Sequence, residues 1–406
     1  METTTKTRIT AQPSLTGDFE TALEQLNEAF FFREFTFSSN TFRPAPGSEL
    51  ELADAVVLLD DLLIVYQVKQ RHALPNTKAE TERKWFSESV LKKATRQIRD
   101  TLSYLEKYSE IELRKNRGHV FNIARARATQ THKLVIYDPH PLLPTECALK
   151  KYHHSKTAGV VHVIHSADYL GVLSTLMTPV EIAEYLAFRE ALVNRWGEAL
   201  SAVNEKALVG QYIRNLPTEK PNDAFEKFVD EVRHKDRNWD VSNMIHVFAE
   251  RRTTPHSSPT VHYKVVKELA KLFRTEMAEF KKRFQFSMKK ALADEYCVPH
   301  RFTTSKECGF VFIPLQREDL PYRQNASLNF TALNKYDQRL DKCVGLTFTA
   351  EGKGSWCDVQ WCHLESPWKE NGELQAALNE NYPFRPVKTK IVERYDLSGF
   401  QAGSVE

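Results

Sequence analysis

Residues 49–69 read ELELADAVVLLDDLLIVYQVK, with an apolar run on either side of Asp60 and Asp61. Short apolar runs bounded by turn residues are typical of buried strands. A two-residue reversal at Asp60-Asp61 joins such strands into a β-hairpin in which Leu59 faces Leu62. The segment therefore predicts a tight hairpin and, with it, the register of every residue pair farther out.

That register brings three polar side chains together at the open end of the hairpin. Asp54 faces Gln67, and Lys69 lies two residues farther along the same strand, on the same face of the sheet. Directly opposed Cβ atoms lie about 5 Å apart. We therefore expect a carboxylate, an amide and an ammonium group to converge, provided that the turn is not longer than two residues.

Such a trio suits the hydrolysis of a phosphodiester. A carboxylate such as that of Asp54 holds Mg²⁺ (or Mn²⁺), a hard cation that takes oxygen ligands. The metal lowers the pKa of a bound water, and a lysine close by stabilises the transition state. Gln67 and the carbonyl of Val68 offer further oxygens. The alternative interpretation is an ordinary strand pair whose polar ends meet solvent.

The pattern of Asp54, a short hairpin and Gln67-Val68-Lys69 resembles the PD-(D/E)XK nuclease superfamily, in particular its Mrr-like branch with glutamine in the acid's place. The resemblance covers roughly residues 14–195. It implies a restriction-endonuclease-like α/β fold, a mixed central sheet flanked by helices. It also implies Mg²⁺-dependent cleavage of DNA, in a restriction or antiphage-defence context.

Two departures from the family pattern bear on the metal shell. Ala53 stands where the family name has proline, and Gln67 replaces an acid. A second carboxylate is therefore needed more than usual. In the family the first helix often carries a metal-holding glutamate, and Glu20 is the matching residue here. Glu51 is our second choice, although it lies on the other face of the strand unless a bulge intervenes.

A long helix is predicted at about residues 81–107, with a basic exposed side. A nuclease needs cations that hold phosphates, and residues four apart share one helix face. The alternative is a solvated face with ion pairs inside the helix. Our candidate nucleic-acid contacts are Arg71, Lys92, Lys93, Arg96 and Gln97.

The remaining patterns define the domains. We expect a flexible N-terminus at 1–13 and a nuclease-like domain at 14–199. Thr178-Pro-Val-Glu181 predicts a helix start, with threonine as the cap, proline at the first position and glutamate closing a capping box. The domain's other expected elements are a helix with a buried stripe from Phe19 to Phe30, strands at 133–137 and 159–164, and a helix ending near Trp196.

Residues 200–406 change character: helical to about residue 293, then strand-like runs at 308–314, 343–350 and 356–362. We expect a helical and α+β C-terminal domain for recognition, sensing or partner binding. Trp356, Trp361 and Trp368 either stack on bases or fill a core.

Composition sets limits on function. The formal net charge is only +3, so any contact with nucleic acid depends on local patches. Six scattered cysteines indicate no disulfide framework, and we expect neither a signal peptide nor a membrane-spanning run. We expect a cytoplasmic protein with no membrane partner. His153, His154, His162 and His165 match no zinc spacing, and we interpret them as surface or packed imidazoles.

The leading hypothesis is a Mg²⁺-dependent endodeoxyribonuclease, a homodimer in the simplest arrangement for cutting both strands. The alternative is a catalytically degenerate nuclease fold that serves as a nucleic-acid-binding or scaffold subunit of a defence or repair complex. A third hypothesis is an effector subunit that a partner protein keeps silent until infection or damage. We also expect that a partner protein or an activating ligand binds the C-terminal domain.

Overall fold

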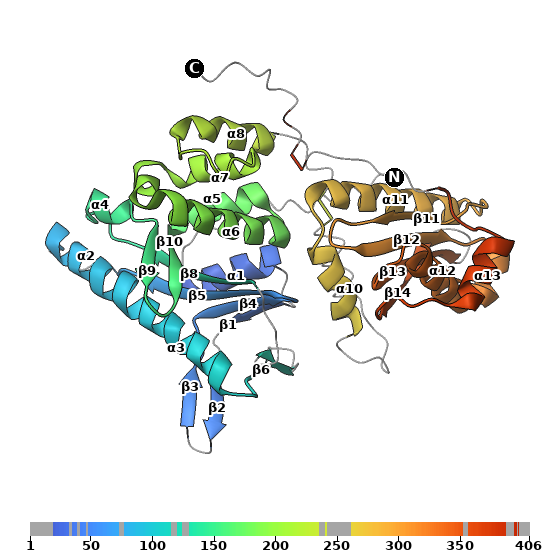
Figure 1. Cartoon of the computed structure of the whole chain (residues 1–406), viewed down its shortest axis with the longest axis horizontal. Helices are drawn as coiled ribbons and strands as arrows, with labels where there is room; N and C mark the ends of the chain where they lie inside the picture. Colours follow the sequence, from blue (N-terminus) through green and yellow to red (C-terminus); the bar gives the residue numbers. More distant parts are fainter. Residues whose placement is uncertain are drawn as a thin grey trace. The chain divides into compact units, whose positions relative to one another are not determined.

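The protein is described from a computed structural model. It divides into two compact units between His234 and Lys235, and each unit is treated by itself (Figure 1). No helix in the described part of the chain is long and apolar enough to cross a membrane. The described residues are 19–31, 35–38, 41–45, 48–72, 77–114, 120–123, 130–234, 240–241, 261–351, 356–386, 394–395 and 397.

A six-stranded mixed sheet forms the centre of the first unit, in the order β1-β4-β5-β8-β10-β9. β5, β8 and β10 run parallel, whereas β1, β4 and β9 pair antiparallel with their neighbours. The expected mixed α/β class is confirmed. The strands are β1 (Thr36–Ser38), β4 (Ala55–Leu59), β5 (Leu62–Gln70), β8 (Gln130–Asp138), β9 (Tyr152–Ser155) and β10 (Gly159–His165).

The predicted hairpin and its register are confirmed. Leu59 pairs with Leu62, and the pairing continues outward to Ala55 and Tyr66. Asp60 adopts the left-handed conformation with φ of +56°, which aspartate tolerates better than most residues because its short side chain bonds locally. The turn therefore contains two residues, as the position of Asp54 opposite the end of β5 requires.

Helices cover both faces of this sheet (Figure 1). One face packs against a long continuous helix whose middle segment, η2, is π-helical. Val65 and Val135 point to this side and join Phe86, Val90 and Ile98 in one apolar cluster. The long helix comprises α2 (Ala79–Trp85), η2 (Phe86–Lys93) and α3 (Ala94–Lys107); a short α4 (Thr145–Ala148) follows β8.

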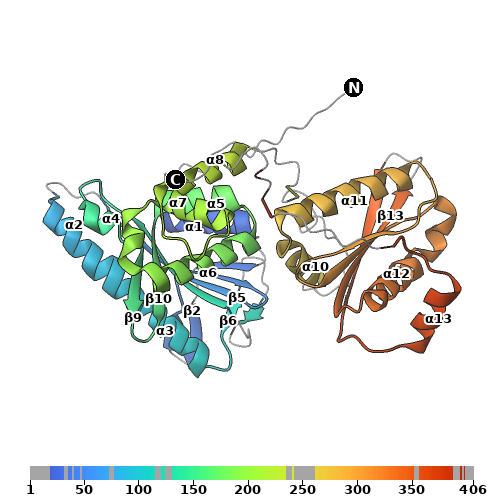
Figure 2. The ribbon, with the colours of Figure 1, turned by 45° about the horizontal axis from the view of Figure 1, so that its top comes forward.

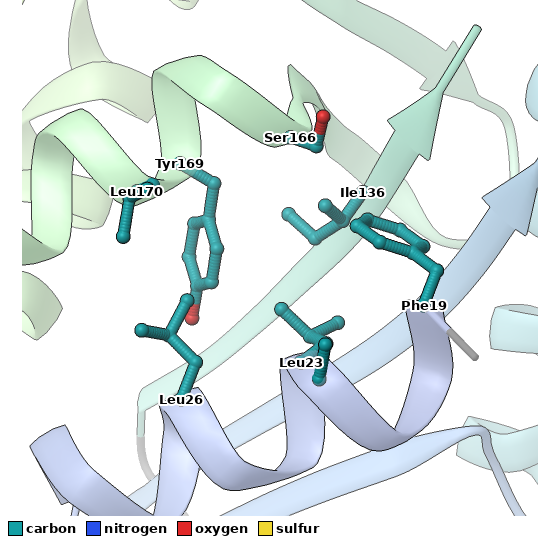
Figure 3. A pocket seen from close by; sticks show the side chains of 8 residues that line it. Phe19, Leu23, Leu26, Ile136, Ser166, Tyr169 and Leu170 are labelled. Carbon is teal, nitrogen blue, oxygen red and sulfur yellow. The ribbon is translucent and has the colours of Figure 1, made fainter. Parts of the chain in front are cut away.

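The opposite face packs against α1 (Phe19–Phe31), α5 (Ser166–Leu176) and α6 (Pro179–Trp196). Phe19 and Leu23 of α1 meet Ile136 of β8 and Tyr169 of α5 (Figure 3). The Tyr169 hydroxyl donates to Asn27 Oδ1 at 2.8 Å, so its polar end is satisfied inside this core. Both faces of the sheet are therefore apolar, because successive side chains along a strand point to opposite faces.

The start of α6 and the parts of the first unit outside the main sheet complete this description. Thr178 Oγ1 accepts from the Glu181 N–H at 3.2 Å, which confirms the predicted helix start. Two small separate sheets leave the main one, β2 (Thr41–Ala45) with β3 (Ser48–Glu51) and β6 (Glu112–Arg114) with β7 (Val120–Asn122). The predicted N-terminal segment 1–13 lies outside the described residues.

The predicted domain boundary at 199/200 is wrong by about one helical hairpin. The first unit continues to His234 because Glu205, at the start of α7, is buried against α6. Its carboxylate accepts from Arg189 Nε at 2.7 Å and lies 3.4 Å from Lys151 Nζ. The added elements are η4 (Gly197–Ala202), α7 (Glu205–Ile213), η5 (Asp223–Phe225) and α8 (Glu226–His234).

The second unit holds a four-stranded sheet in the order β11-β12-β13-β14 between two helical layers (Figure 2). Phe280 packs on Phe310 and Phe312 from one side, and Val311 and Ile313 face the other. The expected helical and α+β character is confirmed. Its elements are α10 (Val261–Ala270), α11 (Arg274–Leu292), β11 (His300–Thr303), β12 (Cys308–Pro314), η6 (Arg317–Tyr322), α12 (Arg323–Asp337), β13 (Lys342–Glu351), β14 (Trp356–Glu365) and α13 (Gly372–Glu380).

The tryptophans of this unit have different environments. Trp361 stacks on Phe280 with ring centres 6.3 Å apart, and Trp368 stacks on Tyr336 at 5.8 Å. Trp356 is 58% exposed. Within the described residues, packing therefore accounts for two of the three rings that sequence alone allowed to stack on bases.

The Glu205 carboxylate, at the start of α7, should make the free energy of unfolding depend on pH in the acid range. Burial by itself raises the pKa of Glu205, but Arg189 and Lys151 outweigh burial and lower that pKa from 4.5 to about 2. A depressed folded-state pKa means that the unfolded chain binds the proton more readily. The stabilisation from Glu205 is therefore complete above pH 4.5, the ordinary pKa, and is lost as the pH falls from 4.5 to about 2.

Glu205→Gln removes the charge that balances two buried cations. Removing one partner of a buried ion pair costs about 3–5 kcal/mol, so the free energy of unfolding at neutral pH, measured in urea, should fall by that order. Glu198→Gln is the control, because Glu198 is 77% exposed and its pair with Lys150 is a surface one. Equal losses in the two variants would contradict this role of Glu205.

Candidate functional site

The predicted trio meets where β5 ends. The Asp54 carboxylate accepts a hydrogen bond from the Val68 N–H at 2.6 Å. Lys69 Nζ lies 3.4 Å from Asp54 Oδ2 and donates to Gln67 Oε1 at 3.2 Å. The hairpin register thus brings together the carboxylate, the amide and the ammonium group as expected.

Lys69 occupies a nest of oxygen atoms. Its ammonium also donates to the main-chain carbonyl of Val68 at 2.8 Å. Because an ammonium only donates, the atom of the Gln67 amide that faces it must be the oxygen. The carboxylate of Asp54, the amide of Gln67 and the carbonyl of Val68 therefore all point their oxygens at one cation.

Burial strengthens these contacts. The side chains of Asp54 and Lys69 are 8% and 14% exposed, and Gln67 is 2% exposed. Electrostatic interactions at such positions are less screened by salt than those on the surface. The cluster is consequently a largely buried polar centre at the end of an otherwise apolar strand.

A half-open cavity of about 270 Å³ adjoins the cluster. Lys69 and Val68 form part of its wall, whereas Asp54 and Gln67 do not line it. The cavity lies at the carboxyl ends of parallel strands, where α/β sheets commonly bind ligands. Its lining residues are Glu20, Val68, Lys69, Gln70, His72, Trp85, Ser89 and Lys93.

The two candidate second carboxylates fall in different places. Glu20, in the first turn of α1, lines the cavity. Glu51 is exposed on β3, paired with Thr41 in a separate two-stranded sheet, and does not line the cavity. Glu51 thus belongs to a separate sheet, and the chain returns to the main sheet only at β4, after Asp54. Of the two glutamates, only Glu20 lines the cavity.

The predicted cationic helix contributes less uniformly. Lys93 lines the cavity. Lys92 is exposed and donates to Glu88 at 2.8 Å, and Arg96 is exposed as well. Gln97 is half-buried, and its Oε1 is buried without a hydrogen-bond partner. Lys93 and Gln97 thus share a helix face, but only Lys93 reaches the cavity wall.

Arg71 is held inside the fold. Its Nε donates to both carboxylate oxygens of Glu82, at 3.0 and 3.2 Å, and the Glu82 side chain is fully buried. The guanidinium also lies 6.0 Å from the centre of the Trp85 ring. Its main contact is therefore a buried counter-charge, not solvent.

Sequence reasoning did not identify four residues that line the cavity, Gln70, His72, Trp85 and Ser89. Trp85, Ser89 and Lys93 recur every fourth residue across the π-helical segment, which keeps them on one line. π-Helical turns often occur at functional sites. The spacing of four residues could have indicated this line of side chains. An aromatic residue at that spacing is, however, more often part of a core.

Tyr137 is the neighbour of Lys69 across the β5–β8 pair. Burial raises the pKa of its phenol, and negative charges nearby add to the shift. The hydroxyl donates to the Ala148 carbonyl at 3.1 Å. This side chain stays neutral and supports the strand beside Lys69.

The residues present fit a hard divalent cation such as Mg²⁺. Asp54, Gln67 and Val68 offer oxygen atoms, Glu20 adds a carboxylate at the cavity, and water can complete the shell, as Mg²⁺ requires. Carboxylate, amide and carbonyl oxygens are the hard donors that Mg²⁺ prefers.

Comparison of the chain with protein-family models, with curated proteins and with solved structures finds no match. The nuclease resemblance therefore remains a prediction from the motif residues.

Arg71→Met should strand the Glu82 carboxylate inside the fold and lower the free energy of unfolding by about 3–5 kcal/mol. Replacing both partners, as Arg71→Met with Glu82→Leu, should restore most of that loss, since an apolar pair needs no counter-charge. Chemical denaturation of the three proteins measures the effect. A single variant as stable as the parent would show that Glu82 does not depend on Arg71.

Proposed function

We propose that this chain is a metal-dependent nuclease that hydrolyses phosphodiester bonds of DNA, with Asp54, Gln67 and Lys69 at its centre. One observation carries the proposal. Oxygen atoms of Asp54, Gln67 and Val68 surround the Lys69 ammonium, and Val68 and Lys69 line a half-open cavity. Such donors suit Mg²⁺, and a lysine at the same point suits a phosphate group.

Each residue has a defined part in this proposal. Asp54 and Glu20 supply carboxylates for the metal, and Gln67 and the Val68 carbonyl supply neutral oxygens. When bound, the metal activates water and neutralises charge on the phosphate. Lys69 then turns from its oxygen neighbours towards the cavity, where its ammonium stabilises the charge that develops on the phosphate.

Lys93 extends the positive charge on the cavity wall, one side of which is the aromatic ring of Trp85. Cations that contact phosphates supply most of the non-specific affinity for DNA. The formal net charge of +3 is small, so the affinity should depend on this local pair of lysines and fall steeply with salt.

A second function is favoured by the same contacts. Because the Lys69 ammonium already satisfies the oxygens of Asp54, Gln67 and Val68, the cluster is stable without a metal. A nuclease fold that has lost activity and serves as a nucleic-acid-binding or scaffold subunit would keep such a cluster. Gln67 in the place of an acid is consistent with this alternative.

Cleavage assays test the first function. Lys69→Ala and Asp54→Asn should each lower the rate of DNA cleavage with Mg²⁺ or Mn²⁺ by a factor of at least about 10²–10³, the usual effect of losing one transition-state donor. Lys156→Ala and Asp60→Asn are matched controls on exposed turns, and thermal unfolding confirms that all four variants fold. Parental rates in both site variants would exclude the proposed centre.

Calorimetry with Mn²⁺ separates the two functions without any substrate. An active centre should bind Mn²⁺ in the parent protein and lose that binding in Asp54→Asn. For a degenerate scaffold we expect no Asp54-dependent heat, while binding to labelled DNA persists and depends on Lys93.

A further inference from the structure

Two buried histidines and a glutamate meet on the other face of the first unit's sheet. One potential ligand atom from each of His132, His162 and Glu190 lies within 4.8 Å of the other two. None of the three belongs to the cluster around Lys69. Spacing in the sequence gave no sign of this group, because His132 and His162 come from different strands and Glu190 from a helix.

The strand register creates the juxtaposition. β8 and β10 are parallel neighbours, and His162 aligns with Leu134, two residues beyond His132. Residues two apart share a face, so both imidazoles point away from the α3 side, where Val135 and Val163 lie. Their ring centres are 6.2 Å apart, and α6, which carries Glu190, packs against both strands.

These imidazoles lack the partners that buried polar groups normally have. His132 is 4% exposed and His162 is 0% exposed. Among the described residues, both ring nitrogens of His132 and Nε2 of His162 are buried without a hydrogen-bond partner. A metal binds imidazole in its neutral form, through a ring nitrogen that carries no proton.

Arg189 determines which nitrogen of His162 carries the proton. Its Nη1 lies 3.0 Å from His162 Nδ1. A guanidinium only donates, so Nδ1 accepts and the neutral ring carries its proton on Nε2. To bind a metal through Nε2, the ring must take the other neutral tautomer, with its proton on Nδ1 and that nitrogen released from Arg189. Glu205 continues to balance the charge of Arg189.

We propose that His132, His162 and Glu190 form a binding site for a divalent transition metal of the zinc type. Two imidazoles and one carboxylate are an established zinc ligand set that leaves one coordination position open. Ligands around a tetrahedral zinc ion are about 3.3 Å apart for bonds of about 2.0 Å, so small side-chain rotations close the site. A bound ion ties β8, β10 and α6 together.

This site is independent of the proposed nuclease centre. Its donors are mostly nitrogen, which zinc prefers, whereas the Lys69 cluster offers oxygen only. His132 lies near the beginning of β8, and the cavity lies at the ends of the parallel strands. Zinc binding and Mg²⁺-dependent cleavage should therefore succeed or fail separately.

The test is metal binding by the full chain after removal of metals with a chelator. Titration with Co²⁺, followed by visible absorption, should show one four-coordinate ion per chain that Zn²⁺ displaces. His132→Gln and Glu190→Gln should each weaken binding by at least about tenfold. His154→Gln, an exposed histidine on β9, and Asp54→Asn should bind as the parent does.

Thermal unfolding supplies a second readout if a variant folds poorly. At a hundredfold excess over the Kd, Zn²⁺ should raise the Tm of the parent by roughly 5–10 °C and leave that of folded Glu190→Gln unchanged. The proposal is overturned if the parent binds no Co²⁺, if binding survives in both His132→Gln and Glu190→Gln, or if it is lost in Asp54→Asn.

Discussion

β5 is hydrogen-bonded on both sides, to β4 through the Asp60-Asp61 turn and to β8 as a parallel neighbour. Seven consecutive residues from Leu62 to Val68 are buried. A shift of one residue in the register of β5 would turn Val65 and Gln67 to the opposite face of the sheet. The apolar side chains that β5 contributes to each core would then lie on the opposite side. The position of the Gln67 amide and the Lys69 ammonium beside Asp54 is therefore fixed by packing far from the site.

This dependence explains which parts of the site could be predicted. The turn residues and the apolar runs set the hairpin register, and the register placed Asp54, Gln67 and Lys69 correctly. The cavity wall depends on where α1 and the long helix dock, which is decided by packing between distant segments. Trp85 and Ser89 were missed for that reason. Glu51 does not reach the cavity because it belongs to the separate β2–β3 sheet.

The domain boundary shows the same limit. The change from mixed to helical patterns near residue 200 was real, but a change of pattern marks a change of secondary structure and not the end of a core. The burial of Glu205 between Arg189 and Lys151 shows that α7 completes the first unit. Likewise, the His132–His162–Glu190 group depends on the order of strands, which no spacing along the chain discloses.

The second unit offers an internal comparison. β11 and β12 pair antiparallel, α12 follows, and β13 returns parallel to β12, the same order as β4, β5, the long helix and β8. Yet β12 reads CGFVFIP and is buried to its last residue, with no polar trio at its end. The order of elements alone therefore does not make a site; the polar residues that end β5 do.

If the oxygens around the Lys69 ammonium form a metal site, as we propose, a bound ion can be located there directly. Crystals of the protein grown with Mn²⁺ and measured by anomalous scattering should show a peak within about 2.2 Å of the Asp54 carboxylate and the Val68 carbonyl, with the Lys69 ammonium moved towards the cavity. No peak at saturating Mn²⁺, with Lys69 still bound to its three oxygen neighbours, would contradict the account.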